Sequence, residues 1–405
     1  MLKNGQCAYI WPSRNAYTLA TPTPFNPKYP DVASLRRKAR RRLPRFAFDY
    51  LDGGCNANEN LHRNRTELQQ VQLMPQYLTN PVQVNLATNL FGHTYNAPFG
   101  IAPIGLQGLI WPKAPQILAR AAVQHNIPFV LSTVSTASIE TIAQITEGKA
   151  WYQLYHPAQE AMTDAILARC QQAGIKVLVA LADVPSFGYR PSDIRNGLAM
   201  PPTFTWRNLW HICQRPRWAF STLLHGQPQF ETLKPYMPKK LNLKQLGTFM
   251  NNTFNGRLTA DRLKALREKW PGTLVVKGIV NEADAQQCAQ LGVDGIIVSN
   301  HGGRQLDIGE STIVPLQRLA PKYSSKMKVM VDGGFASGPD VARGLACGAD
   351  FVFMGRSFMY GTAALGKQGG SHTITMLQKQ LQQVMEQVGC QQPKGLPNAL
   401  VVRQP

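Results

Sequence analysis

The chain has 405 residues and is 44% hydrophobic, which is enough apolar material for a large core and excludes a disordered chain. Its 43 basic and 23 acidic residues give a net charge of +20, which favours anionic partners: a small acid, nucleic acid or an anionic lipid surface. The sequence shows neither zinc-finger spacing nor an RNP-like aromatic motif, so nucleic acid is not expected as a partner.

The seven cysteines do not form the pattern of a disulfide scaffold or a metal site. They are scattered, odd in number and never paired as Cys-x-x-Cys, which indicates reduced thiols in a cytosol. No cluster of histidine, cysteine and carboxylate has metal-ligand spacing, so no metal is expected. The sequence shows no signal peptide and no apolar run of about 18 residues, so no membrane-spanning helix is expected.

The N-terminal part divides into an irregular extension and a basic helical stretch. Residues 1–32 are rich in proline and polar residues and are expected to be irregular. Val32–Leu51 is expected to be helical and to end at Gly53 and Gly54. Its basic run, Arg36–Arg45, has two open interpretations: a solvated helix face, or a patch that binds lipid or acid.

From residue 98 onward, short apolar runs alternate with amphipathic stretches. Eight runs are expected to be strands: Pro98–Ala102, Pro128–Leu131, Ala150–Tyr155, Lys176–Ala182, Leu274–Ile279, Gly295–Ser299, Met327–Val331 and Phe351–Met354. Six stretches between them are expected to be helices: Ala114–His125, Ile139–Thr146, Pro157–Ala173, Glu282–Leu291, Thr312–Ala320 and Pro339–Cys347. The alternation predicts a parallel TIM (β/α)8 barrel over residues 33–390, followed by a tail at 391–405.

Catalytic residues of such barrels lie at the C-terminal ends of the strands. Polar or glycine-rich residues follow all eight predicted strands: Pro103 and Gly105; Ser132; Gln153 and Tyr155; Asp183 and Arg190; Lys277; Ser299, His301 and Arg304; Asp332, Gly333 and Gly334; and Gly355 and Arg356. The last two loops are suited to a phosphate, because glycine N–H groups and Arg356 can bind its oxygens.

The segment Ser299-Asn-His-Gly-Gly-Arg-Gln-Leu-Asp307 carries the most specific chemistry. His301 is suited to act as a general base near neutral pH, and Arg304 offers a fork of donors that matches a carboxylate. From the residues alone, a glycine-rich turn with a solvated arginine is an equal alternative.

This segment resembles, residue for residue, the active-site signature of the FMN-dependent α-hydroxy-acid dehydrogenases and oxidases, a family that includes glycolate oxidase, L-lactate dehydrogenase and mandelate dehydrogenase. The resemblance covers roughly residues 33–390. It implies FMN across the mouth of the barrel and L-2-hydroxy-acid oxidation to the 2-oxo acid. It also implies a homotetramer.

The resemblance assigns roles by position. His301 would be the base, paired with Asp183, and Tyr155 would contact the substrate hydroxyl. Arg304, Arg190 and Tyr50 would bind the substrate carboxylate. The remaining positions would contact FMN: Lys277, Ser132, Gln153, Ser299, Pro103, Gly105, Asp332, Gly333, Gly334, Gly355 and Arg356.

Two positions depart from the family pattern. Leu181 stands where the family usually has a threonine that contacts the flavin, and Ala336 stands where it usually has a phosphate-binding arginine. The loss of one charged hydrogen bond would weaken FMN binding by roughly 1.5–3 kcal/mol. Arg356 is a candidate to compensate.

An insertion of about ninety residues separates the fourth and fifth strands, too long for an ordinary loop. Within it, residues 203–253 contain Trp206, Trp210 and Trp218 among seven basic residues, a composition that suits a membrane interface. A lid or an oligomer contact is an equal alternative. The stretch Arg215–Trp218 resembles the insertion of the membrane-associated lactate and mandelate dehydrogenases.

The leading hypothesis is a dehydrogenase peripheral on the inner face of the cell membrane that passes electrons to a quinone or cytochrome. The alternatives are an oxidase that reduces O2 to hydrogen peroxide, and a catalytically lapsed barrel that only binds a flavin or an anion.

Overall fold

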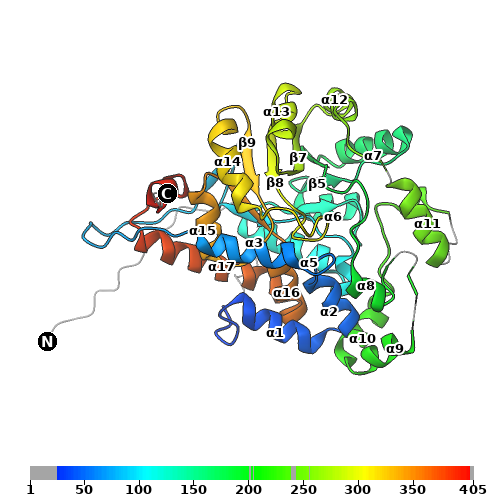
Figure 1. The fold of residues 1–405 in the computed structure, drawn as a ribbon. Coiled ribbons are helices and arrows are strands. Elements are labelled where there is room, and N and C mark those ends of the chain that lie inside the picture. Colours follow the sequence, from blue (N-terminus) through cyan, green and yellow to red (C-terminus); the bar gives the residue numbers. More distant parts are fainter. Residues whose placement is uncertain (1–24, 200–201, 204, 239–242, 255, 402–405) are drawn as a thin grey trace, which may run out of the picture.

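The chain is a parallel β-barrel surrounded by helices (Figure 1). The computed structural model describes residues 25–199, 202–203, 205–238, 243–254 and 256–401, so the extension expected before residue 25 lies outside the described residues. The barrel strands are β3 (Phe99–Ile101), β4 (Val130–Ser132), β5 (Trp151–Leu154), β6 (Val177–Leu181), β7 (Thr273–Ile279), β8 (Gly295–Val298), β9 (Lys328–Val331) and β10 (Phe351–Met354). All eight predicted strands are confirmed.

Neighbouring strands pair in the order β3-β10-β9-β8-β7-β6-β5-β4, all parallel. A parallel bridge between Ile101 and Phe129 joins the two outer strands and closes the ring. Parallel pairing therefore runs around the barrel, and one short bridge completes it between β3 and β4.

An antiparallel hairpin, β1 (Thr88–Leu90) and β2 (His93–Tyr95), plugs the N-terminal end of the barrel. Phe91 and Tyr95 of the hairpin pack on Trp151 and Phe351 inside the barrel, and Trp151 Nε1 donates to the Tyr95 hydroxyl at 3.2 Å. The opposite, C-terminal end of the barrel is therefore the end at which a ligand site is expected. This hairpin was not predicted from the sequence.

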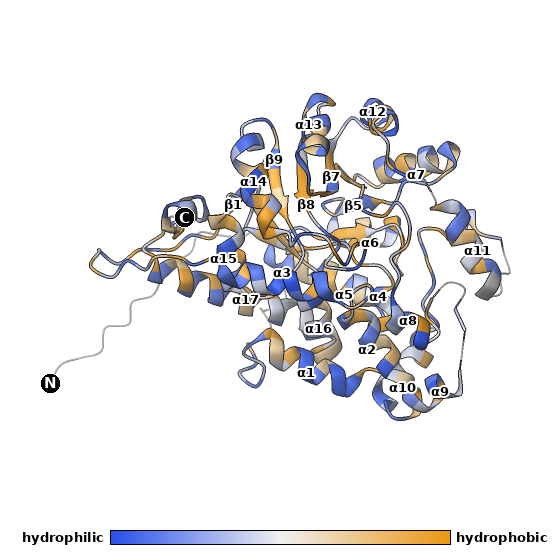
Figure 2. Cartoon of the chain, viewed as in Figure 1, coloured by the Kyte–Doolittle hydropathy of each residue, from blue (hydrophilic) through white to orange (hydrophobic). Residues whose placement is uncertain are grey.

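Helices cover the outside of the barrel. They are α5 (Ala114–His125), α6 (Ile139–Thr146), α7 (Glu160–Gln172), α12 (Ala260–Lys269), α13 (Glu282–Gln290), α14 (Ile313–Tyr323), α15 (Gly338–Ala346), α16 (Arg356–Leu365) and α17 (Gly369–Gln387). The six predicted helices are confirmed. Their apolar faces turn toward the strands or, for α17, toward α5, α15 and α16, and their hydrophilic faces lie outside (Figure 2).

The prediction of one helix over Val32–Leu51 is wrong, because two helices occupy it: α1 (Val32–Arg42) and α2 (Arg45–Asp52). Leu43 has φ −90° and ψ 145°. The ring of Pro44 disfavours helical backbone in the residue before it, so α1 must end at this point. A short helix, α3 (Glu59–Gln70), then packs beside α14 and α15.

The insertion folds into short helices: α8 (Pro191–Arg195), α9 (Trp206–Cys213), α10 (Pro216–His225), a 3-10 turn (Lys234–Tyr236) and α11 (Leu243–Thr253). Trp206 and Trp210 are exposed, but Trp218 is buried and its indole N–H donates to the carbonyl of Ile110 at 3.1 Å. The expectation that all three tryptophans lie at an interface is therefore wrong for Trp218, which anchors α10 to the barrel.

Candidate active site

A cavity of about 1220 Å³ lies at the C-terminal end of the barrel. Of the residues predicted for the site, these line it: Tyr50, Pro103, Gly105, Tyr155, Arg190, Lys277, His301, Arg304, Asp332, Gly333, Gly334, Gly355 and Arg356. They come from most of the barrel strands and from α2, so only the closed barrel brings them together.

His301, Asp183 and Lys277 form a connected group on one side of the cavity. His301 Nδ1 lies 3.0 Å from Asp183 Oδ1, and the other carboxylate oxygen lies 3.7 Å from Lys277 Nζ. Burial opposes ionisation of Asp183, but Lys277 and His301 outweigh it and hold the pKa of this carboxyl below its usual value. The carboxylate therefore fixes Nδ1 of the imidazole and leaves the other ring nitrogen for chemistry.

His301 itself has φ +57°, a left-handed conformation that is uncommon for residues other than glycine. Its backbone N–H donates to Ser299 Oγ at 3.0 Å, which holds the turn. Glycines at 302 and 303 continue the left-handed turn with φ +66° and +73°. The Gly-Gly pair therefore allows the chain to bring His301 and Arg304 to the same cavity.

Lys277 is buried among oxygen atoms. Its Nζ lies 2.7 Å from Ser299 Oγ and 3.2 Å from Asp332 Oδ2. Burial disfavours the ammonium, but Asp183 and Asp332 raise the pKa of Lys277 above its usual value. The lysine is therefore a fixed cation beside the cavity.

Tyr50 lies between two arginines on another wall of the cavity. The guanidinium carbons of Arg304 and Arg190 are 5.1 and 5.4 Å from its ring centroid. Burial, with Arg190 and Arg356 nearby, lowers the pKa of Arg304 to about 10. Arg304 has no carboxylate partner among the described residues and donates to the backbone carbonyls of Tyr50 and Gly53 at 2.7 and 3.1 Å. This wall favours an anionic ligand.

Four predicted residues do not line the cavity. Asp183 stands behind His301, and Ser299 Oγ accepts from Lys277. Ser132 and Gln153 are buried neighbours in register on β4 and β5. Leu181, the first departure from the family pattern, is buried at the end of β6 beside Lys277.

Two features of the site were missed in the sequence. Gln305 bridges the loops after β6 and β8, donating to the carbonyls of Asp183 and Ser186 and accepting from Gly188 N–H. Its place in the motif was visible, but its partner loop was not. The insertion contributes buried Phe230 and Met250 to the cavity wall, and no sequence signal marked them.

Comparison with known proteins identifies the family. A sequence model of the FMN-dependent dehydrogenases matches residues 39–403. The chain belongs to the FMN-dependent dehydrogenase family. FMN is therefore its cofactor, and the chain is an FMN-dependent oxidoreductase of the hydroxy-acid dehydrogenase and oxidase group.

Individual relatives agree along most of their length. An L-lactate dehydrogenase of Xanthomonas euvesicatoria pv. vesicatoria (strain 85-10) is 37% identical over 88% of this chain and 92% of its own. The structure of a monotopic membrane protein, (S)-mandelate dehydrogenase, matches with TM-score 0.87 and 33% identity over 93% of this chain and all of its own. A mandelate oxidase structure matches with TM-score 0.78 and 30% identity over 93% of this chain and 98% of its own.

The residues of this flavoenzyme fit FMN. Gly333 and Gly334 have φ +90° and +87°, and a side chain on either would collide with Asn300 or Asn64, so only glycine fits at these two positions of the cavity wall. The buried Oδ1 of Asp332 accepts no hydrogen bond from the described residues, which suits a hydroxyl-bearing chain. Lys277 adds a fixed positive charge beside the same cavity.

Proposed function

We propose that this flavoenzyme oxidises an L-2-hydroxy acid to the 2-oxo acid and passes the electrons to a quinone or cytochrome at a membrane. The observation that carries the chemistry is the meeting of two features in one cavity. One is a His301–Asp183 pair 3.0 Å apart, and the other is a half-buried pair of arginines, Arg304 and Arg190, of which only Arg190 has a carboxylate partner in the described part of the chain, Asp193 at 3.1 Å. The first suits proton removal and the second suits a carboxylate.

In this proposal Arg304, Arg190 and Tyr50 bind the substrate carboxylate, and Tyr155 contacts the substrate hydroxyl. His301 removes a proton from Cα or from the hydroxyl, and Asp183 stabilises the resulting imidazolium. FMN, when bound, would supply the acceptor for the substrate's two electrons and its second hydrogen. Lys277 holds positive charge beside the ring, a fixed electrostatic contribution of the protein. Pro103 and Gly105 line the cavity and would hold the ring, whereas Ser132 and Gln153 do not line it.

The substrate side chain would lie against apolar residues that include Phe230 and Met250 of the insertion, together with Leu198 and Ile110. This wall suits a substituent larger than a methyl group, because apolar surface in the pocket is then buried by the ligand. A mandelate-like acid is therefore favoured over lactate as substrate.

The experiment is anaerobic bleaching of the yellow holoenzyme by L-lactate, L-mandelate and longer-chain hydroxy acids. We expect bleaching by L-2-hydroxy acids, fastest with the bulky apolar ones, and none by the corresponding D-isomers. No bleaching by any acid would indicate the lapsed barrel. Rapid recolouring in air with formation of hydrogen peroxide would indicate the oxidase.

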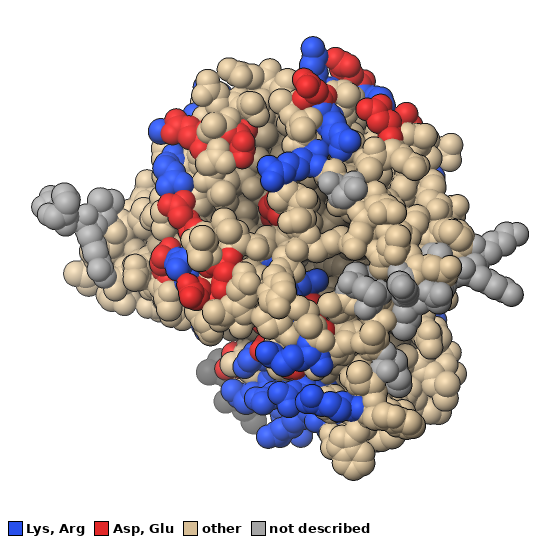
Figure 3. Space-filling view, turned by 45° about the vertical axis from the view of Figure 1, so that its right-hand side comes forward, with Lys and Arg blue, Asp and Glu red and all other residues tan. Residues whose placement is uncertain are grey.

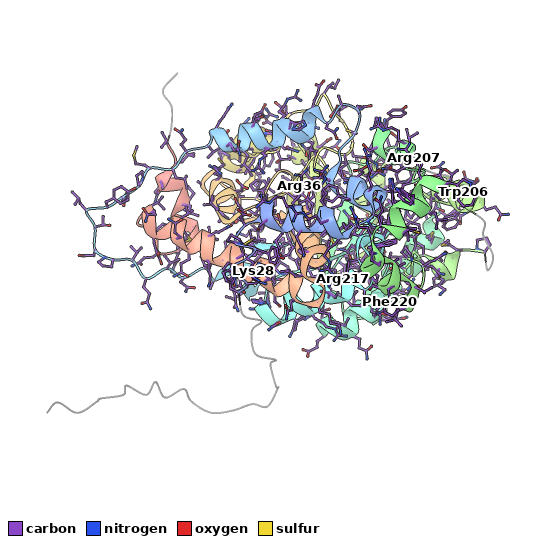
Figure 4. All side chains as sticks on the ribbon, turned by 90° about the horizontal axis from the view of Figure 1, so that it is seen from below. Lys28, Arg36, Trp206, Arg207, Arg217 and Phe220 are labelled. Atoms are coloured by element: carbon purple, nitrogen blue, oxygen red, sulfur yellow. The ribbon has the colours of Figure 1, made fainter. Side chains whose placement is uncertain are left out.

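We further propose that α9 and α10 dock on an anionic membrane. Their outer sides expose Trp206 (86% exposed), Trp210, Phe220, Leu223 (81%) and Leu224, which suits insertion at headgroup level. Arg207 and Arg217 lie beside them, and Lys28 and Arg36 lie on the same lower face (Figure 4). The basic side chains gather below the barrel (Figure 3). In the part of the chain that is described, no helix is long and apolar enough to cross a membrane.

Co-sedimentation with anionic liposomes tests this docking at the inner face of the cell membrane. We expect the wild type to bind at low salt and to be partly released at high salt, since screening weakens only the charged contribution. The double variant Trp206→Ser, Phe220→Ser should remain in the supernatant, and substrate should still bleach its flavin. Val123→Ser, an exposed apolar residue of α5, is the matched control. Wild-type protein in the supernatant would favour a lid or an oligomer contact.

A further inference from the structure

The phosphate-binding end of the cofactor site carries less positive charge than its loops suggest. The loop after β9 has no cation between Gly333 and Gly338. Arg356, on the next loop, donates to the backbone carbonyls of Leu51, Gly302 and Gly53 at 3.1, 3.0 and 2.9 Å. Each of its three nitrogens thus donates to a backbone carbonyl, and two of these bonds hold the N-terminal segment against the barrel.

The N-terminus of α15 is also occupied. The carboxylate of Asp340 accepts from the backbone N–H groups of Ala336 and Ser337 at 3.1 and 3.0 Å. Because a carboxylate already satisfies these groups, this helix end does not attract a second anion. Arg343 of α15 also lines the cavity, but it is paired with the other Asp340 oxygen at 2.9 Å and donates to the carbonyl of Val71. A phosphate dianion near Gly334 is therefore best served by a cation from another element.

Helix α3 approaches this loop directly. A Cβ placed on Gly334 would lie 2.9 Å from Asn64 Cβ and 3.0 Å from its carbonyl oxygen, so the two segments are in contact. The next residue, Arg65, lines the cavity together with His62 and Gln69. Spacings of three and four residues place these three side chains on one face of the helix.

Arg65 is available for a ligand. It is exposed, and among the described residues it forms no ion pair or hydrogen bond. Its neighbour Arg63 is different, because it pairs with Glu59 and Glu67 and donates to the carbonyl of Gly309. Arg65 is thus a cation without a structural partner beside the glycine loop.

We propose that Arg65 of α3 binds the phosphate of FMN, supplying from outside the barrel the charge that the loop after β9 lacks. The contact is charge-assisted and partly solvated, so it favours phosphate-bearing flavin over riboflavin and weakens as salt increases. The inference uses the FMN site alone, so it does not depend on which acid is oxidised.

The test is flavin exchange on the full-length holoenzyme. The protein is equilibrated with FMN and riboflavin, and the bound flavins are released and quantified. In Arg65→Gln the ratio of bound riboflavin to bound FMN should rise about tenfold at low salt, equivalent to about 1.4 kcal/mol. The change should shrink at high salt, and Arg65→Lys should lie close to wild type.

Arg40→Gln is the matched control, because Arg40 is an exposed cation on α1 that does not line the cavity. A ratio unchanged in Arg65→Gln would overturn the proposal. If Arg65→Gln weakens the binding of FMN and of riboflavin by the same factor, the proposal is also overturned, since Arg65 would then stabilise the fold and not contact the phosphate. Because a ratio is measured, partial unfolding of a variant does not imitate the result.

Discussion

Gln305 Nε2 donates to the backbone carbonyl of Asp183 at 2.9 Å, which ties the loop carrying His301 and Arg304 to the loop carrying Arg190. The same amide nitrogen lies 3.1 Å from the Ser186 carbonyl, and Oε1 accepts from Gly188 N–H at 3.1 Å. One side chain therefore sets the separation of two loops that line the cavity.

Gln305→Ala should raise KM about tenfold and lower kcat less, because the loop that carries Arg190 loosens while His301 keeps its Asp183 partner. Gln305→Glu should not rescue the loss, since a carboxylate cannot donate to the two carbonyls. Steady-state kinetics measures this, with Gln382→Ala on the outer face of α17 as the control. A fall in kcat with constant KM would contradict a role in positioning.

Removal of the imidazole should abolish the reductive step but leave the cofactor bound. His301→Asn should lower the rate of anaerobic flavin bleaching at least about 100-fold, the scale of a general base. Asparagine is chosen because it tolerates the left-handed backbone at this position better than alanine. Stopped-flow absorbance checks the rate, and His225→Asn on exposed α10 is the control. A wild-type rate in His301→Asn would disprove the base assignment.

Arg304→Lys should raise KM and lower turnover, each by about tenfold or more, because an ammonium lacks the planar fork of donors. A comparison of free acids with their methyl esters isolates the effect of the substrate's carboxylate charge. Wild type should oxidise the acid much faster than the ester, and this ratio of rates should be smaller in the variant. Melting temperatures of both proteins show whether lost bonds to Tyr50 and Gly53 alone explain the defect. Equal rates for acid and ester in wild type would exclude a carboxylate clamp.

The Asp183 carboxylate should make the free energy of unfolding depend on pH in the acid range. Its pKa in the folded chain lies below the ordinary value of 3.8, so the unfolded state binds the proton more readily. Its contribution is therefore fully present above about pH 4 and is lost as pH falls through the folded pKa. At pH 7 the melting temperature of Asp183→Asn should lie below that of wild type. This difference in melting temperature should become smaller below about pH 4.

Thermal unfolding from pH 3 to pH 7 checks this dependence. Asp261→Asn, an exposed residue of α12, is the control and should show no such narrowing. If the difference in melting temperature between wild type and Asp183→Asn stays constant from pH 3 to pH 7, the charge of the carboxylate does not stabilise the fold. The same variant should bleach about 100-fold or more slowly, because the imidazole loses its acidic partner.

The sequence by itself determined the eight barrel strands and six of the helices around them. Eight apolar runs of strand length, separated by amphipathic stretches, allow few other arrangements, since each buried parallel strand needs helices on its outer side. The motif at 299–307 also identified His301 and Arg304 as candidates. From the residues alone a solvated glycine-rich turn was an equal alternative, and the resemblance of the whole motif to the family favoured the catalytic interpretation.

Only the tertiary structure decided which side chains meet. Arg65 and Phe230 gave no signal, and Gln305 was visible only as part of the motif. Their partners lie on elements distant in the chain, and local periodicity records only that a residue is exposed or buried. Trp218 is buried where its indole N–H donates to the carbonyl of Ile110. Arg356 donates to the carbonyls of Leu51 and Gly53. Backbone carbonyls are present at every residue, so a sequence cannot show which of them a side chain will reach.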